Sequence, residues 1–135
     1  MPIVFYVLSV NMDTAKVIEL FVSLTGQVKV YHWATTSYAA HKALDELHGT
    51  LSPLVDKFVE SFIGRYKRQP LKVFTIESVA TSDAVTSKID GYLENERDKI
   101  LALRKSIDKT GLELQSILDD MIIAIDNTLY LLKLK

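Results

Sequence analysis

The chain has 135 residues, enough for one domain with a hydrophobic core, and it has no cysteine, which excludes disulfides and thiolate metal sites. Its formal net charge of −1 provides no overall basic surface for DNA or for an anionic membrane. Residues 1–11 are strongly apolar, lack the basic start of a signal peptide and are too short to cross a bilayer. We therefore expect an N-terminal segment that packs on the protein or on a neighbouring subunit, followed by one helical domain over residues 12–135.

Apolar residues recur every three or four positions in four stretches, which is the spacing of helices with one buried face. We predict helices over residues 13–34, 37–65, 83–108 and 111–133. Asp13 and Ser37 precede the first two stretches and are suitable N-caps, because their side-chain oxygens can accept the free backbone N–H groups of the first turn.

Pro53 lies inside the second predicted helix, where it either begins a new helix or kinks a single one. The apolar phase continues through it, since Leu44, Leu51 and Phe58 are spaced seven residues apart. The residue four positions before the proline is Gly49, which leaves the most room for the proline ring. We therefore predict one long, kinked helix.

About twenty residues separate the second and third helices, which is long for a loop in a helix bundle. This connection can hold a short element over residues 71–80, and its length suits a crossover to the far side of the bundle. No strand-rich region follows residue 10. The predicted fold is all-α, a four-helix bundle with the long connection between its second and third helices that ferritin-like proteins have.

The second helix also carries a polar stripe beside its apolar face. An α-helix turns by ~100° per residue, which places five polar residues within about a quarter of the circumference of this helix. They are His41, Asp45, Ser52, Asp56 and Glu60. A solvated flank is usually lysine and glutamate, whereas this one is histidine and carboxylate. The first two of these residues are four apart and can reach one metal ion from adjacent turns, and so can the last two.

His41 and Asp56 are fifteen residues apart, or ~22 Å along a helix, so one chain cannot bring both pairs to one ion. Two copies of the helix can, when they pack antiparallel about a two-fold axis near Thr50, with Gly49 at the crossing. His32, at the end of the first helix, could complete each site. Two imidazoles and three carboxylates suit iron, manganese or zinc, but not copper(I).

These residues resemble the ferroxidase signature of the Dps family of mini-ferritins. The resemblance covers about residues 13–135 and extends to short Dps-like proteins of phages and large DNA viruses. Three motifs have the family's residue types. The first is the histidine–tryptophan pair His32–Trp33 at the end of the first helix. The other two are pairs of residues spaced four apart, His41-x3-Asp45 and Asp56-x3-Glu60, and the spacing from His41 to Glu60 is the family's.

The resemblance implies a cytoplasmic homo-oligomeric shell, in the host cytoplasm for a viral protein, with two-fold interfaces and commonly twelve subunits. Such shells oxidise Fe(II) with peroxide or O2 and store the ferric mineral, which protects against oxidative damage. Carried over by position, the iron ligands from one subunit are His32, His41 and Asp45. The ligands from its partner are Asp56 and Glu60, of which Glu60 would bridge the irons. Trp33 would be a redox-active neighbour of the irons.

The sequence also departs from the family pattern. His32 and His41 are nine residues apart, about one helical turn fewer than is usual, which makes His32 the least secure ligand. The N-terminus is apolar rather than lysine-rich, so charge does not support DNA binding. The family's iron-entry pore is lined by acidic residues early in the fourth helix. Here only Glu113 lies near the start of that helix, and Asp119 and Asp120 follow later in it.

Other functions stay open, because each short motif taken alone is more often an ordinary solvated pair. The main alternative is a ferritin-like helical oligomer with a structural or binding role and little metal chemistry, and DNA compaction is a third. His48 has no support as a ligand, Trp33 is equally compatible with the core, and residues 65–68 read as a solvated helix end. No Glu-x-x-His occurs in the chain, which excludes the usual di-iron signature inside a bundle.

Overall fold

The computed structural model describes residues 14–66 and 86–134, and nearly all of them belong to four α-helices. These helices are α2 (Thr14–Ala34), α3 (Tyr38–Tyr66), α4 (Thr86–Ser106) and α5 (Leu112–Lys133). The two described stretches contain no strand, which confirms the prediction of an all-α chain with four helices there. The apolar segment 1–11, the predicted cap Asp13 and the element predicted over 71–80 lie outside the described residues.

The observed helices agree with the predicted ones to within three residues at every described boundary. The second helix is continuous from Tyr38 to Tyr66 and contains Pro53, so the prediction of a single helix rather than two is confirmed. The seven-residue spacing of its apolar side chains, which does not slip at the proline, is the signal that made this visible in the sequence.

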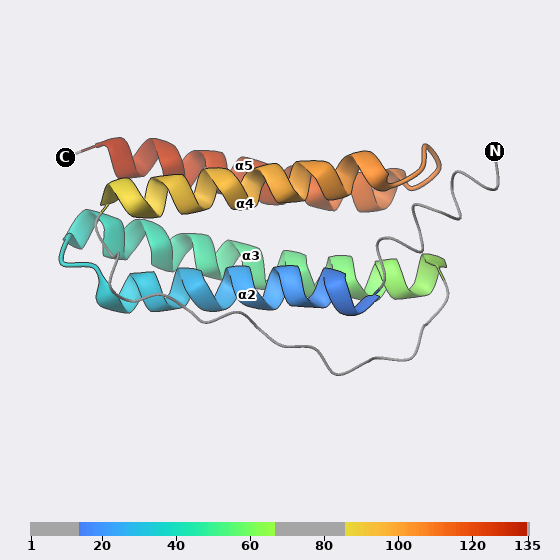
Figure 1. Ribbon diagram of the computed structural model, residues 1–135, viewed down its shortest axis with the longest axis horizontal. Helices are drawn as coiled ribbons and strands as arrows, with labels where there is room; N and C mark the ends of the chain where they lie inside the picture. The colour runs from blue at the N-terminus through green and yellow to red at the C-terminus, as the bar shows by residue number, and fades with distance from the viewer. Residues whose placement is uncertain (1–13, 67–85, 135) are drawn as a thin grey trace.

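The helices form two antiparallel pairs, α2 with α3 and α4 with α5 (Figure 1). α3 also packs against α5, so the two pairs face each other across a common core. Figure 1 shows that α3 ends at the opposite end of the bundle from the start of α4. α3 and α4 therefore run in the same direction. Among the described helices, none combines the length and the apolar character that a membrane span requires.

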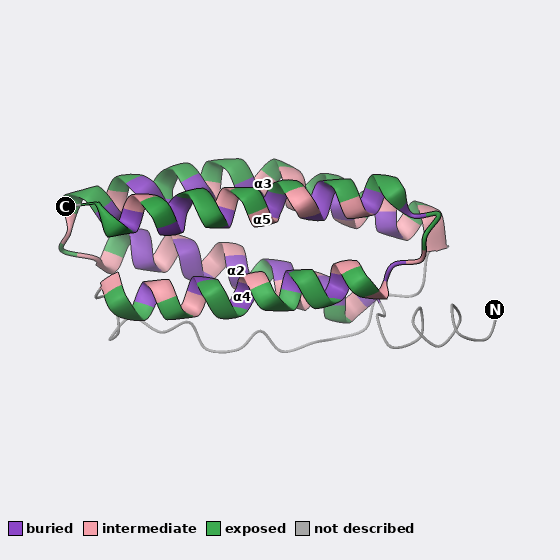
Figure 2. Ribbon diagram, turned by 90° about the horizontal axis from the view of Figure 1, so that it is seen from above, coloured by how far each residue is buried: buried purple, intermediate pink, exposed green. Residues whose placement is uncertain are grey.

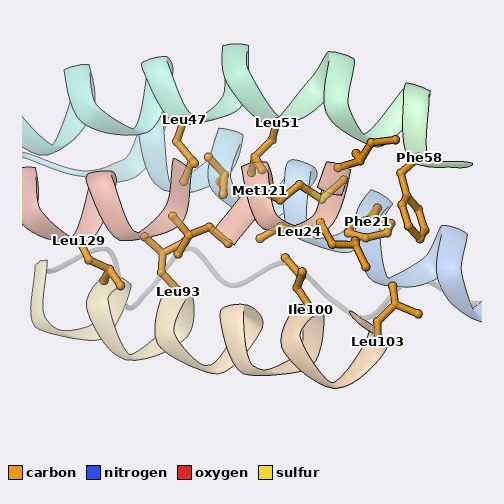
Figure 3. Packing of buried hydrophobic residues seen from close by; sticks show 14 of the residues in the cluster. Phe21, Leu24, Leu47, Leu51, Phe58, Leu93, Ile100, Leu103, Met121 and Leu129 are labelled. Atoms are coloured by element: carbon orange, nitrogen blue, oxygen red, sulfur yellow. The ribbon is translucent and has the colours of Figure 1, made fainter. Parts of the chain in front are cut away.

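The core is built from one side of each helix, where buried positions recur (Figure 2). Phe21 of α2 meets Phe58 of α3 edge-to-face, with ring centroids 5.5 Å apart. Leu93 and Ile100 of α4 point into the same space (Figure 3). Because the core occupies only one side of α3, the opposite flank of this helix is free to carry polar residues.

Two of the three acidic residues expected near an iron-entry pore form ion pairs within the chain. Asp119 Oδ1 lies 2.5 Å from Nε of Arg104, and Glu113 Oε2 lies 3.3 Å from Nη1 of Arg65. Asp120 is exposed. The first pair joins α4 to α5 and the second joins α3 to α5, so two of these three carboxylates make contacts within one chain.

Candidate metal centre

A short corner joins α2 to α3 and begins the candidate site. α2 ends at Ala34 and α3 begins at Tyr38. Ser37 caps α3 as predicted, because its Oγ accepts the backbone N–H of Ala40 at 3.2 Å, and its own N–H donates to Oγ1 of Thr35 at 3.2 Å. These local hydrogen bonds stop one helix and start the next within three residues, so the last turn of α2 lies beside the first turn of α3.

His32 and His41 are joined across this corner by a reciprocal pair of hydrogen bonds, which we call the histidine clasp. Nδ1 of His32 donates to the carbonyl oxygen of His41 at 2.8 Å, and Nδ1 of His41 donates to the carbonyl oxygen of His32 at 2.8 Å. The two rings stack with centroids 3.9 Å apart and planes 20° apart. The His32 carbonyl is among the last four of α2, which lack a helical partner, so the clasp also caps that helix.

The clasp determines which nitrogen of each ring can bind a metal ion. A backbone carbonyl only accepts hydrogen bonds, so Nδ1 carries the hydrogen in both rings. In the neutral imidazole, Nε2 then has a free lone pair, which is the form that ligates metals. Metal-binding histidines commonly donate their other ring N–H to a carbonyl in this way, which fixes the orientation of the ring.

Asp45 completes a cluster that we call the half-site, made of His32, His41 and Asp45. Nε2 of His32 lies 3.8 Å from Oδ1 of Asp45. His32 is 7% exposed and His41 is half-buried, whereas Asp45 is exposed on α3. The three residues predicted to come from one subunit therefore lie together, and His32, which looked the least secure, is the most firmly held.

Asp56 and Glu60, which we call the acidic pair, are exposed on α3 and are not brought to the half-site. Because α3 is continuous, the fifteen residues between His41 and Asp56 correspond to ~22 Å of helix. In the described parts of the chain, no group of three or more His, Cys, Asp or Glu side chains is arranged to hold a metal ion. In a single chain, the candidate ligands thus form two separate groups rather than one complete site.

Three further side chains surround the half-site. Trp33 is 68% exposed, so its interpretation as a core residue is wrong for the single chain. Tyr38 is 75% exposed and its ring stacks over His41 with centroids 6.4 Å apart. Nζ of Lys29 lies 3.6 Å from Oδ1 of Asp45 and 5.8 Å from the centre of the Trp33 ring. Sequence reasoning missed Tyr38 and Lys29, although each is one helical turn from a predicted ligand, Tyr38 before His41 and Lys29 before His32.

The charges around the half-site also affect the pKa of His48, a residue that sequence reasoning did not support as a ligand. It is half-buried on α3, three residues after Asp45. Its pKa lies below the ordinary value of 6.5 because burial disfavours the charged ring and because the positive charge of Lys29 adds to that effect. The carboxylate of Asp45 acts in the opposite direction.

A second group of charged residues lies in a groove between α4 and α5. Nη1 of Arg97 donates to Oδ1 of Asp126 at 2.9 Å, and both residues line the groove. Oδ1 of Asp90 is buried without a hydrogen-bond partner among the described residues. Burial, followed by the charge of Glu94, raises the pKa of Asp90, and Lys133 opposes this. The groove therefore combines one ion pair, Arg97–Asp126, with a partly buried carboxyl group, Asp90.

We predict that His41→Ala and His32→Ala each lower the free energy of unfolding by ~1–2 kcal/mol, because each removes one hydrogen bond of the clasp and the ring stack. Urea unfolding followed by circular dichroism measures the change, with Glu46→Ala, an exposed residue on the same helix, as the matched control. Equal stability of all four proteins would show that the clasp does not hold the corner.

We predict that Asp90→Asn stabilises the protein at pH 7. A carboxyl whose pKa is raised by folding adds stability below its unfolded pKa and loses it as the pH rises through the folded pKa, so the ionised form is unfavourable in the folded state. The gain should disappear below about pH 4, where the acid is protonated in both states. Thermal unfolding across this pH range measures it, and a gain that does not change with pH contradicts the prediction.

Comparison with known protein families places this chain in one of them. Residues 32–132 match a family described as "Family of unknown function (DUF5856)", a stretch that begins at His32 and includes all of α3 and α4. Comparisons with curated proteins and with solved structures gave no match. The match covers about three quarters of the sequence, including every residue of the half-site and the acidic pair. The chain therefore belongs to the DUF5856 family.

Proposed function

We propose that the protein is a Dps-like ferroxidase, an oligomer that oxidises Fe(II) and stores the ferric product in a shell. The observation that carries this proposal is the histidine clasp, which engages Nδ1 of both His32 and His41 with backbone carbonyls, while Nε2 of His32 lies near Asp45. A solvated histidine on a helix surface needs no such arrangement. Two oriented imidazoles and a carboxylate are hard-to-borderline donors and suit Fe(II) as a bound substrate.

The acidic pair would supply the remaining ligands from a second copy of the chain. Asp56 and Glu60 lie four residues apart on the same polar stripe of α3 as His41 and Asp45, all on one continuous helix. An antiparallel two-fold packing of α3 on α3 brings the acidic pair of one copy to the half-site of the other. Each such dimer would contain two equivalent iron sites.

Gly49 supports a close approach of two helices at the centre of this stripe. A glycine inside a helix costs about 1 kcal/mol relative to alanine. Packing within the chain does not require it, because a methyl group at Gly49 would meet no other atom within 4 Å. A second copy of α3 that crosses there would benefit from the missing side chain. The common direction of α3 and α4, which suits a long ferritin-like crossover, also supports the proposal.

In the proposed reaction, two Fe(II) ions each give one electron to hydrogen peroxide, whose O–O bond breaks. The ferric ions form an oxyhydroxide with water and release protons. The role of this chain is to hold the substrate ions close together, with the clasp fixing the imidazoles and the exposed carboxylates accepting protons. Trp33, exposed beside the half-site, would take up oxidising equivalents that leave the site.

An alternative is a helical oligomer of the same shape that has a structural or binding role. The exposed rings of Trp33 and Tyr38 favour it, because aromatic residues with this exposure are enriched at protein interfaces. Both functions share the two-fold interface, and only the first requires the half-site to bind and oxidise iron.

We predict that the protein assembles through α3, with a mass near twelve subunits of 15.2 kDa. Gly49→Leu should reduce the mass, because the larger side chain separates the crossing helices. Gly91→Leu is the matched control, since Gly91 is an exposed glycine on α4 with equally open space around it. Light scattering measures the mass, and a monomeric wild-type protein would exclude the proposed site.

We predict that wild-type protein oxidises Fe(II) with peroxide faster than buffer, and that His41→Ala and Asp56→Ala both lose this activity. Asp98→Ala, which removes an exposed carboxylate on α4, should retain it. Ferric absorbance after mixing measures the rate. If the wild type and all variants react at the buffer rate, the alternative function is favoured.

Mixing the two inactive variants distinguishes a shared site from a site within one chain. When His41→Ala and Asp56→Ala chains are unfolded together and reassembled, half of the dimers contain one chain of each kind. In such a dimer, one site lacks both the His41 imidazole and the Asp56 carboxylate, and the other site has both. Reassembly should therefore restore about a quarter of the wild-type activity. No recovery would contradict the two-chain site even if the wild type is active.

A further inference from the structure

Lys29 places a positive charge where a metal ion would require a free carboxylate. Its Nζ lies 3.6 Å from Oδ1 of Asp45, and Nε2 of His32 lies 3.8 Å from the same oxygen. One carboxylate oxygen therefore faces an ammonium group and a ligating nitrogen at once. The lysine is close enough to neutralise the carboxylate in the absence of metal.

A metal ion and the ammonium group cannot both use this oxygen at close range. Two positive charges a few ångströms apart repel each other, and an ion that binds Asp45 also has to break the existing ion pair. Both effects lower the affinity for a cation. The charge of Lys29 also helps to lower the pKa of His48, which lies three residues after Asp45 on α3.

We propose that Lys29 is an internal competitor cation, which occupies Asp45 in the metal-free protein and has to move away when a divalent ion binds. This inference rests on the proposed function, and it assigns a residue that sets the affinity of the half-site. Lys29 does not touch the reacting atoms, so it is a positioning residue rather than a ligand.

Trp33 makes this exchange measurable. Nζ of Lys29 lies 5.8 Å from the centre of the Trp33 ring, in the range of a cation–π contact. Trp33 is the only tryptophan in the chain. When an ion displaces Lys29 from Asp45, the ammonium group changes its position relative to the indole ring. Tryptophan emission should therefore report occupancy of the half-site without any redox reaction.

The experiment uses Zn(II), a divalent ion that this donor set also accepts and that undergoes no oxidation. Calorimetric titration of the full-length wild-type protein and of Lys29→Gln gives the two affinities. Lys29→Gln should bind Zn(II) about fivefold more tightly, the effect of one unit charge at this distance near a surface. Zn(II) should shift the emission of Trp33 in the wild type and shift it less in Lys29→Gln.

Two further variants separate a local effect from a general one. Lys29→Arg keeps the charge and should retain the wild-type affinity. Lys42→Gln removes an exposed lysine next to His41 on α3, and it should change the affinity less than twofold. Equal gains in Lys29→Gln and Lys42→Gln would overturn the proposal, because net charge alone would then explain the result.

The outcomes also separate this inference from the proposed function. If the wild type binds Zn(II) and Lys29→Gln binds it within twofold of that affinity, Lys29 is not a competitor, while the metal-binding half-site stands. If neither protein binds Zn(II), both the half-site and the competitor role are wrong. Tighter binding by Lys29→Gln alone, with the smaller tryptophan response, supports both.

Discussion

The reciprocal hydrogen bonds between His32 and His41 are the constraint on which the site depends. They hold the last turn of α2 against the first turn of α3, and they select the protonated nitrogen of each ring. Each bond contributes about 1 kcal/mol to stability, modest for folding but sufficient to fix two side chains in one rotamer. The clasp thus caps the end of α2 and orients the two imidazoles that we propose as ligands.

α3 has an apolar face that packs in the core and a polar flank that is exposed. Its inward side supplies a row of leucine and phenylalanine residues to the core, and its flank carries the half-site and the acidic pair. Because the core fixes the rotation of α3, it also fixes the direction in which the flank faces. The polar stripe is therefore held in a fixed direction without being buried, which suits the proposed packing against another copy of the chain.

The helices and the continuity of α3 through Pro53 were predictable, because apolar spacing is a local property that survives in the sequence. The grouping of His41 with Asp45 was predictable for the same reason. The clasp was not, since it depends on how three residues turn the corner between Ala34 and Tyr38. Lys29 was missed because an ion pair between two helices has no signature in the spacing of either one.

The continuity of α3 has an evolutionary consequence. Both groups of proposed ligands lie on one helix, so their separation and their relative angle are set by the number of residues between them. A substitution between Asp45 and Asp56 changes one side chain, whereas inserting or deleting one residue there turns the two groups by ~100° relative to each other. The proposed site therefore constrains the length of this part of the gene more than its composition, and it also constrains the length of the corner before it, because the clasp depends on that corner.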